Sequence, residues 1–381
     1  MGAVTRLASL VAAAALTFGS PGAPATAAPA TAAPAALANL AVVGSASGAA
    51  AVTPTIAQLI GQKLVVRMEG TTPSAALLGR IQRGEVGGVI LFCSNITTAD
   101  ALVTLTAQLH AAAAAGGQPP LLIAVDQEGG AVKRIPWAPP TLSPPQMGAL
   151  ASTSIARVQG AETGAALRGL GIDVDLAPVA DVPASTSSFM YRARRTWSFD
   201  ASRTAWLATA FAQGLMLRSV APTMKHFPGI GYATTNTDTT VVKITASRTA
   251  LAPGLLPYRR AIASHVPLIM LSNATYPAWD PVHAAGWSPA IVGTLLRRDL
   301  GFTGVTITDS LDGTASVRGI SVRRLAAAAA RAGTDMILTT GSEAGTAAVY
   351  AYLVEQATAG SIPLAALRAS YARIVALKAL P

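Results

Sequence analysis

The feature that most limits the possible folds is a regular alternation of short apolar segments with longer helix-like stretches. Eight such segments are rich in β-branched and other apolar residues. In chain order they are "KLVVRM" (63–68), "GGVILF" (87–92), "LLIAVD" (121–126), "DVDLAPVA" (173–180), "VAPTMKHF" (220–227), "PLIMLSN" (267–273), "GVTITD" (304–309) and "DMILTT" (335–340). Strands that are apolar along almost their whole length are typical of a parallel sheet buried on both faces.

Helix-like stretches separate most of these segments. We expect helices over residues 98–115, 155–170, 201–217, 255–264, 289–300, 322–332 and 343–357, and a final helix over 363–378. Eight strand–helix units favour a closed (β/α)8 barrel of the TIM type over an open doubly wound sheet. No glycine-rich dinucleotide fingerprint follows any strand, which further weakens the Rossmann alternative. We therefore predict an α/β fold, a single (β/α)8 barrel that occupies residues 53–381.

The first 52 residues differ in composition from the rest of the chain. Arg6 precedes an apolar stretch over residues 7–18, which is too short to span a bilayer but has the length of a signal-peptide core. Small residues suited to cleavage follow at 25–27. We predict a signal peptide over residues 1–28 and an Ala/Pro-rich flexible spacer over residues 29–52. The protein is therefore expected to be secreted or cell-wall associated, without stable membrane insertion.

Net charge limits the kinds of partner that the protein can bind, and cysteine content limits its disulfides. The 381-residue chain is 51% hydrophobic and 12% charged, and its formal net charge is +10. The arginines are scattered and form no basic block, so we expect no nucleic-acid partner. A positive surface would instead suit acidic cell-wall polymers. The single cysteine, Cys93, excludes an intrachain disulfide and is expected to be buried at a strand end. Nothing in the sequence indicates an obligate partner, and we expect a monomer.

Polar residues follow five successive predicted strands. A (β/α)8 barrel carries its active site at the C-terminal ends of its strands. The residues found there are Asp126, Asp181, Lys225, His226, Ser272, Asn273 and Asp309. An Asp in this position could instead cap the next helix, but five strand ends in a row are hard to explain by capping and packing. After Asp126, two glycines would let a ligand approach closely. Glu128 is expected to be structural.

The available residue types favour carboxylate chemistry. The chain has no His-x-His, HExxH or cysteine cluster, so we expect no metal, and it has no G-x-S-x-G nucleophile elbow. No cofactor is indicated. Carboxylates surrounded by basic and amide hydrogen-bond donors suit sugar hydroxyls. Glycoside hydrolysis needs a carboxylate near the anomeric carbon and a proton donor for the leaving oxygen.

Several motifs resemble the catalytic barrel of glycoside hydrolase family 3, and its bacterial β-N-acetylhexosaminidase branch in particular. They are "DQEGGAVKRI", "LAPVADV", "KHFPGIG", "GFTGVTITDSL" and "AGTDMILTT", and the resemblance covers residues 55–380. It implies a carbohydrate substrate, β-linked N-acetylglucosamine in particular, and Asp309 as the nucleophile of a retaining mechanism. It further implies that Asp126, Lys225, His226 and Arg195 bind sugar hydroxyls. By position, Asn273 and Asp181 are additional candidates for substrate binding.

The sequence also departs from this family pattern. The loop after "KHFPGHG" in the hexosaminidase branch carries an Asp-x-His pair that acts as general acid/base. Here Ile230 replaces the His that follows the first Gly of that motif, and the pair's positions hold the triplet Asn236, Thr237 and Asp238. Ser310 stands where a second Asp usually follows the nucleophile. We expect Asp238 to be the proton donor, with its pKa raised by burial. Two alternatives remain: an enzyme for another sugar or linkage, and a carbohydrate-binding protein without turnover.

Overall fold

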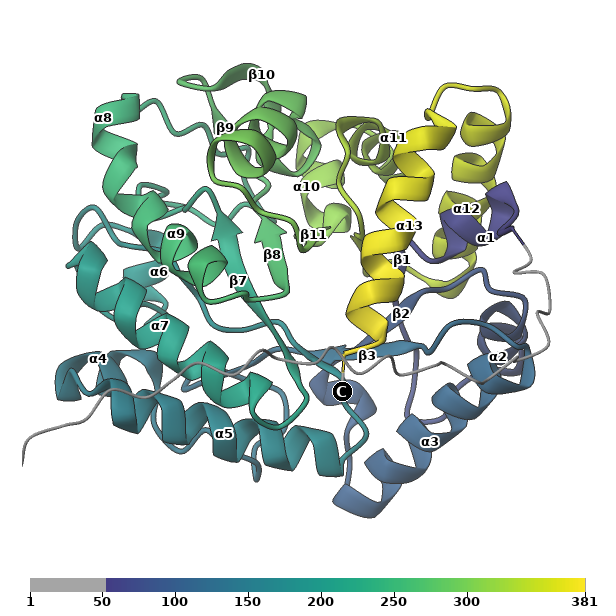
Figure 1. The fold of residues 1–381 in the computed structure, drawn as a ribbon, viewed down its shortest axis with the longest axis horizontal. Helices are drawn as coiled ribbons and strands as arrows, with labels where there is room; N and C mark the ends of the chain where they lie inside the picture. The colour runs from purple at the N-terminus through teal and green to yellow at the C-terminus, as the bar shows by residue number, and fades with distance from the viewer. Residues whose placement is uncertain (1–52, 381) are drawn as a thin grey trace, which may run out of the picture. The chain divides into compact units, whose positions relative to one another are not determined.

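Eight parallel strands form the centre of the protein, as predicted (Figure 1). The computed structural model describes residues 53–380, so the predicted signal peptide and spacer lie outside the described residues. The strands are β1 (Leu64–Arg67), β2 (Gly88–Leu91), β3 (Leu122–Val125), β6 (Val174–Asp175), β7 (Ala221–Phe227), β8 (Leu268–Leu271), β11 (Val305–Thr308) and β12 (Ile337–Thr339). Neighbours in the sheet follow chain order, and β12 also pairs with β1. A bridge between Ile307 and Met336 joins β11 to β12, which closes the barrel.

Helices surround the strands, and the predicted ones begin and end within about two residues of their expected bounds (Figure 1). They are α3 (Ala99–Ala115), α5 (Thr153–Gly169), α7 (Ala201–Met216), α9 (Leu256–Ala263), η4 (Ala290–Asp299), α11 (Val322–Ala332), α12 (Glu343–Thr358) and α13 (Leu364–Lys378). The helices not expected are α1 (Ile56–Gly61), α2 (Ala75–Gln82), α4 (Pro144–Leu150), α6 (Phe189–Arg192), α8 (Arg248–Leu251) and α10 (Leu311–Arg318), with short 3₁₀ turns η1 (Cys93–Asn95), η2 (Ala252–Leu255) and η3 (Ala285–Trp287).

Two small hairpins extend the loops above the barrel. Strands β4 (Gln127–Gly129) and β5 (Val132–Lys133) follow β3, and β9 (Thr275–Tyr276) and β10 (Asp280–Ala284) follow β8. In η1, directly after β2, Cys93 is exposed. The expectation of a buried thiol was therefore wrong, because the chain leaves the barrel one residue earlier than the apolar run suggests.

Side chains alternate between the barrel lumen and the surrounding helices. In β8, Leu268 and Met270 point into the lumen, whereas Ile269 and Leu271 pack outward against the helices. The lumen is filled by branched and long apolar side chains from all the barrel strands except β7, as expected for a packed barrel. Ile374 and Leu377 of α13 belong to the same lumen cluster. The inside of the barrel is thus a second apolar core.

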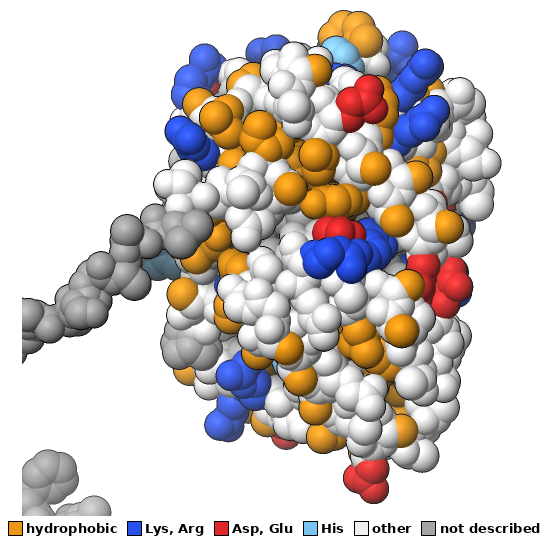
Figure 2. Space-filling model, turned by 90° about the vertical axis from the view of Figure 1, so that its right-hand side faces the viewer, with side chains coloured by type: hydrophobic (Ala, Val, Ile, Leu, Met, Phe, Trp, Pro, Cys, Tyr) orange, Lys and Arg blue, Asp and Glu red, His pale blue; other side chains and the backbone are white. Residues whose placement is uncertain are grey.

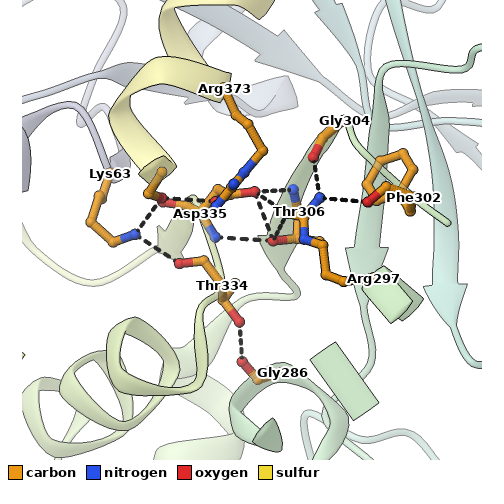
Figure 3. Close-up of polar contacts among 10 residues, drawn as sticks. Lys63, Gly286, Arg297, Phe302, Gly304, Thr306, Thr334, Asp335 and Arg373 are labelled. Atoms are coloured by element: carbon orange, nitrogen blue, oxygen red, sulfur yellow. Dashed lines mark hydrogen bonds and ion pairs between the residues drawn. The ribbon is translucent and has the colours of Figure 1, made fainter. Parts of the chain in front are cut away.

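A buried ionic cluster lies at the seam where the barrel closes (Figure 3). Asp335, which precedes β12, is fully buried. One of its oxygens accepts hydrogen bonds from Arg297 Nη2 of η4 at 2.5 Å and from the backbone N–H of Thr306 in β11 at 2.9 Å. The other accepts from Arg373 Nη2 of α13 at 2.7 Å. Lys63 Nζ donates to the Thr334 carbonyl at 2.8 Å. One carboxylate therefore connects η4, β11, β12 and α13.

We expect Asp335→Ala to destabilise the protein by about 3–5 kcal/mol, because it leaves the partly buried guanidinium groups of Arg297 and Arg373 and the buried ammonium of Lys63 without their counter-charge. Burial alone raises the pKa of Asp335, but hydrogen bonds from Arg373 and the charges of Arg297 and Lys63 lower it below its usual value. The ionised carboxylate therefore stabilises the fold above the unfolded-state pKa, and this stability is lost as the pH falls through the lower folded-state pKa.

Denaturant melts of wild type and Asp335→Ala at neutral pH measure this effect. The matched control is Asp299→Ala, which removes an exposed carboxylate paired with Arg298 at the surface. We expect the control to melt like wild type. Equal midpoints for wild type and Asp335→Ala would show that the cluster does not hold the seam.

On the face shown in Figure 2, Lys and Arg side chains occur in separate small groups among polar and apolar side chains. They do not form the continuous basic stripe that is typical of a nucleic-acid-binding surface. No helix among residues 53–380 combines the length and apolarity that crossing a membrane requires.

Candidate active site

A small cavity opens at the C-terminal ends of the barrel strands. Its volume is about 180 Å³, which is below the roughly 300–1,000 Å³ of sites for drug-sized ligands and suits a single small ring. Its floor is the top layer of the barrel lumen, formed by Ile90, Leu176, Met270 and Leu338. Its polar lining residues are Asp126, Arg134, Arg195, Lys225, His226, Asn236, Thr237, Asp238, Asp309, Ser310 and Thr340.

Two larger cavities lie elsewhere. One of about 770 Å³ is at the opposite end of the barrel, beside the starts of β3, β7 and β8. The other, of about 760 Å³, lies beyond α6. Each has a single acidic residue in its lining, whereas the small cavity has three. Barrel enzymes place their chemistry at the C-terminal ends of the strands, so the small cavity is the candidate active site.

Four charged residues form an ionic cluster at one side of this cavity. Lys225 Nζ lies 2.7 Å from both Asp126 Oδ1 and Glu128 Oε1. Arg195 binds Glu128 with two hydrogen bonds, from Nε at 2.8 Å and from Nη2 at 2.7 Å. Burial alone raises the pKa of Glu128, but the charges of Arg195 and Lys225 lower it to about 2. All four residues therefore stay charged at neutral pH.

Glu128 does not line the cavity, which agrees with its expected structural role. It holds Lys225 and Arg195 in place from behind. Arg192 and Arg194, which are close to Arg195 in the sequence, do not line the cavity either. Of the three arginines, Arg195 is therefore the one that faces the site.

Arg134 is a cavity residue that we did not predict from the sequence. Its Nη2 lies 3.1 Å from Asp126 Oδ2, and its backbone N–H donates to the Asp126 carbonyl at 3.2 Å. The β4–β5 hairpin brings the two residues together. Gly129 and Gly130, at the turn of this hairpin, have φ values of 90° and 64°, which other residues rarely adopt. The two glycines thus serve the turn, and neither lines the cavity.

His226 is oriented by a buried carboxylate. Its Nδ1 lies 2.8 Å from Asp181 Oδ2. Asp181 Oδ1 accepts a hydrogen bond from the backbone N–H of Ile230 at 2.7 Å. Asp181 is fully buried and does not line the cavity. It therefore fixes the His226 ring and the start of the following loop, and it is placed to position a ligand-binding residue rather than to contact a ligand. Ile230, where the "KHFPGHG" motif has the His after its first Gly, is part of the cavity wall.

Asp309 follows β11 directly and is partly exposed to the cavity. Its Oδ1 accepts a hydrogen bond from the backbone N–H of Ser310 at 2.8 Å. The Ser310 hydroxyl lies 2.7 Å from that of Thr340, and the Ser310 carbonyl accepts from Asn273 Nδ2 at 2.7 Å. Asn273 is buried and does not line the cavity. Like Asp181, it supports the site from behind.

Asp238 reaches the same cavity from the loop after β7. Its backbone N–H donates to Asn236 Oδ1 at 3.0 Å. The loop packs closely on α10 at Gly313. A side chain at this position would place its Cβ only 2.8 Å from the carbonyl oxygen of Asp238. Partial burial and the negative charge of Asp309 raise the pKa of Asp238 to about 6. The residue is still exposed on its outer side, so solvent can exchange its proton.

Asp175, at the end of β6, is a fully buried carboxyl beneath the ionic cluster. Its Oδ1 accepts from the Gln127 backbone N–H at 3.0 Å, whereas Oδ2 has no hydrogen-bond partner among residues 53–380. Burial raises its pKa to about 8, and the charges of Asp126 and Glu128 contribute. Between about pH 4 and pH 8 the folded state therefore keeps a proton that the unfolded state has lost, so stability falls as the pH rises.

We expect Asp175→Asn to weaken this pH dependence, because asparagine keeps the hydrogen bond from Gln127 and does not titrate. The measurement is the difference in melting temperature between pH 5 and pH 8, which should be smaller by a few degrees in Asp175→Asn than in wild type. Asp100→Asn, an exposed carboxylate in the first turn of α3, is the control and should behave like wild type. An unchanged difference in Asp175→Asn would contradict the expectation.

Of the eight predicted site residues, six line one cavity: Asp126, Arg195, Lys225, His226, Asp238 and Asp309. Asp181 and Asn273 lie directly behind it. Apolar wall residues that the sequence did not indicate are Phe92, Val132, Phe189 and Met190. Among residues 53–380, no group of three or more His, Cys, Asp or Glu side chains is arranged to hold a metal ion.

Comparison with known proteins agrees with this architecture. The family model of the glycosyl hydrolase family 3 N-terminal domain matches residues 55–377. The chain is 33% identical over 341 residues to a protein of Arthroderma benhamiae named an uncharacterized secreted glycosyl hydrolase, covering 88% of this chain and 96% of that one. It is 34% identical over 265 residues to a β-hexosaminidase of Xylella fastidiosa, covering 68% and 76%.

A solved structure extends the comparison to the fold. The family 3 β-N-acetylglucosaminidase of Paenibacillus sp. superposes with a TM-score of 0.81 at 30% sequence identity. The match covers 86% of this chain but 62% of the Paenibacillus chain, so the chain spans about three fifths of that relative.

Proposed function

Because the chain belongs to glycosyl hydrolase family 3, we propose that this glycoside hydrolase is a secreted retaining β-N-acetylhexosaminidase. It removes terminal β-linked N-acetylglucosamine from cell-wall or chitin-type glycans. One observation carries the proposal: Asp309 and Asp238, from different parts of the chain, line one small cavity together with Asp126, Lys225, His226 and Arg195. The names of the Xylella and Paenibacillus relatives support the choice of sugar. The pattern of residues 1–28 and the name of the Arthroderma relative support secretion.

In the first step, an oxygen of Asp309 attacks the anomeric carbon of the bound sugar and the glycosidic C–O bond breaks. Asp238, protonated below its pKa of about 6, gives its proton to the leaving oxygen. The product is a glycosyl ester of Asp309. In the second step, Asp238 takes a proton from water as the water attacks the same carbon and releases Asp309. Two inversions give net retention.

The ionic cluster beside the cavity, formed by Asp126, Glu128, Arg195 and Lys225, binds and orients the sugar during both steps. Asp126 offers carboxylate oxygens as acceptors, and Lys225 and His226 offer N–H donors within the same wall. The pKa of Lys225 is raised: burial lowers it, but Asp126 and Glu128 raise it more. The charged groups are thus held by one another before a ligand arrives, which reduces the reorganisation that binding requires.

The proposal is tested by the release of 4-nitrophenol from its β-N-acetylglucosaminide and, in parallel, from its β-glucoside. We expect faster release from the N-acetylglucosaminide, with the β-anomer of N-acetylglucosamine as the first product by NMR. Faster release from the glucoside would change the sugar assignment, and initial α-anomer would exclude retention.

The absence of the family's His from the acid/base loop keeps a second function open, a sugar-binding protein without turnover. If neither substrate reacts while N-acetylglucosamine still binds in calorimetry, this second function replaces the first.

A further inference from the structure

The groove of about 760 Å³ beyond α6 is larger than the catalytic cavity of about 180 Å³. Its lining residues come from α4, α6 and the first turn of α7, and the loop over residues 193–200 forms its floor and side. Trp197 in this floor is buried and donates from Nε1 to the Val179 carbonyl at 2.8 Å. A Cβ at Gly148 of α4 would lie 1.8 Å from the Trp197 carbonyl. The floor is therefore fixed by close packing, and the groove is preformed.

The groove has an excess of positive charge. Arg192, Arg194 and Arg203 line it, and none of the three forms an ion pair with any residue of the described range 53–380. Its acidic residue, Asp200, is already engaged as the N-cap of α7, where it accepts from the Arg203 backbone N–H at 2.6 Å. Arginine side chains stay charged and match the geometry of a carboxylate with two parallel hydrogen bonds. The groove is therefore complementary to an anion.

Two exposed aromatic rings lie beside these arginines. Tyr191 is 40% and Phe199 is 47% exposed, and their ring centroids are 4.8 Å apart. Large exposed aromatic side chains next to arginines are enriched at binding surfaces, where a flat apolar face can pack on a ring-shaped ligand. The pairing of flat apolar faces with unpaired guanidinium groups suits a chain of sugar rings that carries carboxylates.

The groove and the catalytic cavity share one wall. On one side of α6, Phe189 and Met190 line the cavity; on the other, Tyr191 and Arg192 line the groove. After α6 the backbone turns at Arg194, whose φ is 58°. As a result Arg194 lines the groove, while the next residue, Arg195, lines the cavity.

We propose that this groove is a second glycan-binding site that holds a carboxylate-bearing sugar chain, so that the enzyme prefers acidic glycans to neutral ones. The inference rests on the proposed function, because the bound chain is a longer part of the same kind of glycan. It adds a substrate class that the catalytic cavity, with room for one ring, does not determine.

The test uses a short chitin oligosaccharide and its carboxymethylated form of the same length. Binding is measured by calorimetry in the Asp309→Ala background, so that neither probe is consumed. We expect tighter binding of the carboxymethylated form, and a loss of roughly three- to tenfold in its affinity when Arg194→Gln and Arg203→Gln are combined. Affinity for the neutral form should be unchanged. Arg192 is left intact because its guanidinium also contacts the Thr234 carbonyl in the loop that carries Asp238.

The matched control is the pair Arg324→Gln and Arg331→Gln, two exposed arginines of α11. This pair removes the same charge away from the groove and should leave both affinities unchanged. Equal affinity of the parent for both probes, or an equal loss in the control pair, would overturn the proposal. Polyglutamate, an anion without sugar rings, is the third probe. If it binds as tightly as the carboxymethylated oligosaccharide, and Phe199→Ala affects neither, the groove is a general anion patch and the glycan site is excluded.

Binding and turnover separate the two proposals. If the enzyme is inert on both aryl glycosides but binds the carboxymethylated probe through Arg194 and Arg203, the proposed activity fails and the second site stands. If turnover is normal and the two probes bind alike, the activity stands and the second site fails.

Discussion

Asp309→Ala is expected to lower kcat by roughly 10⁴-fold or more while N-acetylglucosamine still binds. Removing the nucleophile prevents formation of the glycosyl ester, and alanine offers no group that could replace it. The substitution should leave the fold intact, because the Asp309 carboxylate accepts one hydrogen bond from the described part of the chain, from the Ser310 backbone N–H. The ionic cluster around Lys225 has no contact with this carboxylate, so sugar binding should survive.

The measurement combines the turnover of 4-nitrophenyl β-N-acetylglucosaminide with calorimetric binding of N-acetylglucosamine, and a thermal melt confirms folding. Asp100→Ala, which removes an exposed carboxylate of α3 that does not line the cavity, serves as the control and should keep full activity. Turnover within about tenfold of wild type in Asp309→Ala would show that another group forms the covalent bond. Loss of both turnover and binding in a folded variant would instead make Asp309 a binding residue.

The barrel could be predicted because its strands and helices have strong local patterns. Each strand is an almost uninterrupted apolar run, and α7 and α11 have apolar residues at helical spacing that begin after a turn. The β4–β5 and β9–β10 hairpins could not be predicted, because their strands are too short to establish a period and lack the apolar run that marks the equally short barrel strands, as in "QEG" and "DPVHA". The short helix α6, which forms the wall between the two sites, has the same difficulty.

The active site could be predicted only in part, because the sequence does not show which way a side chain points. A strand end determines the height of a residue along the barrel axis, but not the direction of its side chain. Asp126 and Asp309 face the cavity. Asp181 and Asn273 instead lie behind the cavity wall, where Asp181 contacts the His226 ring and Asn273 donates to the Ser310 carbonyl. Arg134 was missed because its place depends on a hairpin that returns the chain to Asp126 eight residues later. Its signal in the sequence was the pair of glycines, which indicated a tight turn.

Asp238→Asn is expected to have the second-largest effect, and its size should depend on the leaving group. A general acid contributes about 10²–10⁴-fold to rate. With a disaccharide of β-linked N-acetylglucosamine, the leaving sugar oxygen needs the proton, and the full loss should appear. With the 4-nitrophenyl substrate, the first step needs little protonation, so the loss should fall mainly on the second step. Azide, a nucleophile that needs no general base, should then restore part of the rate and form the β-glycosyl azide.

The pH profile provides an independent test of the same residue. Partial burial and the charge of Asp309 raise the pKa of Asp238 to about 6. Because the acid must be protonated in the first step, kcat/KM of wild type for the disaccharide should fall as the pH rises through this value. Asp238→Asn should lose this alkaline limb, whereas Asp100→Asn should keep it. A variant that retains both the rate and the limb would exclude Asp238 as the acid. His226 would then be the next candidate, because it lines the same cavity and Asp181 supports its ring.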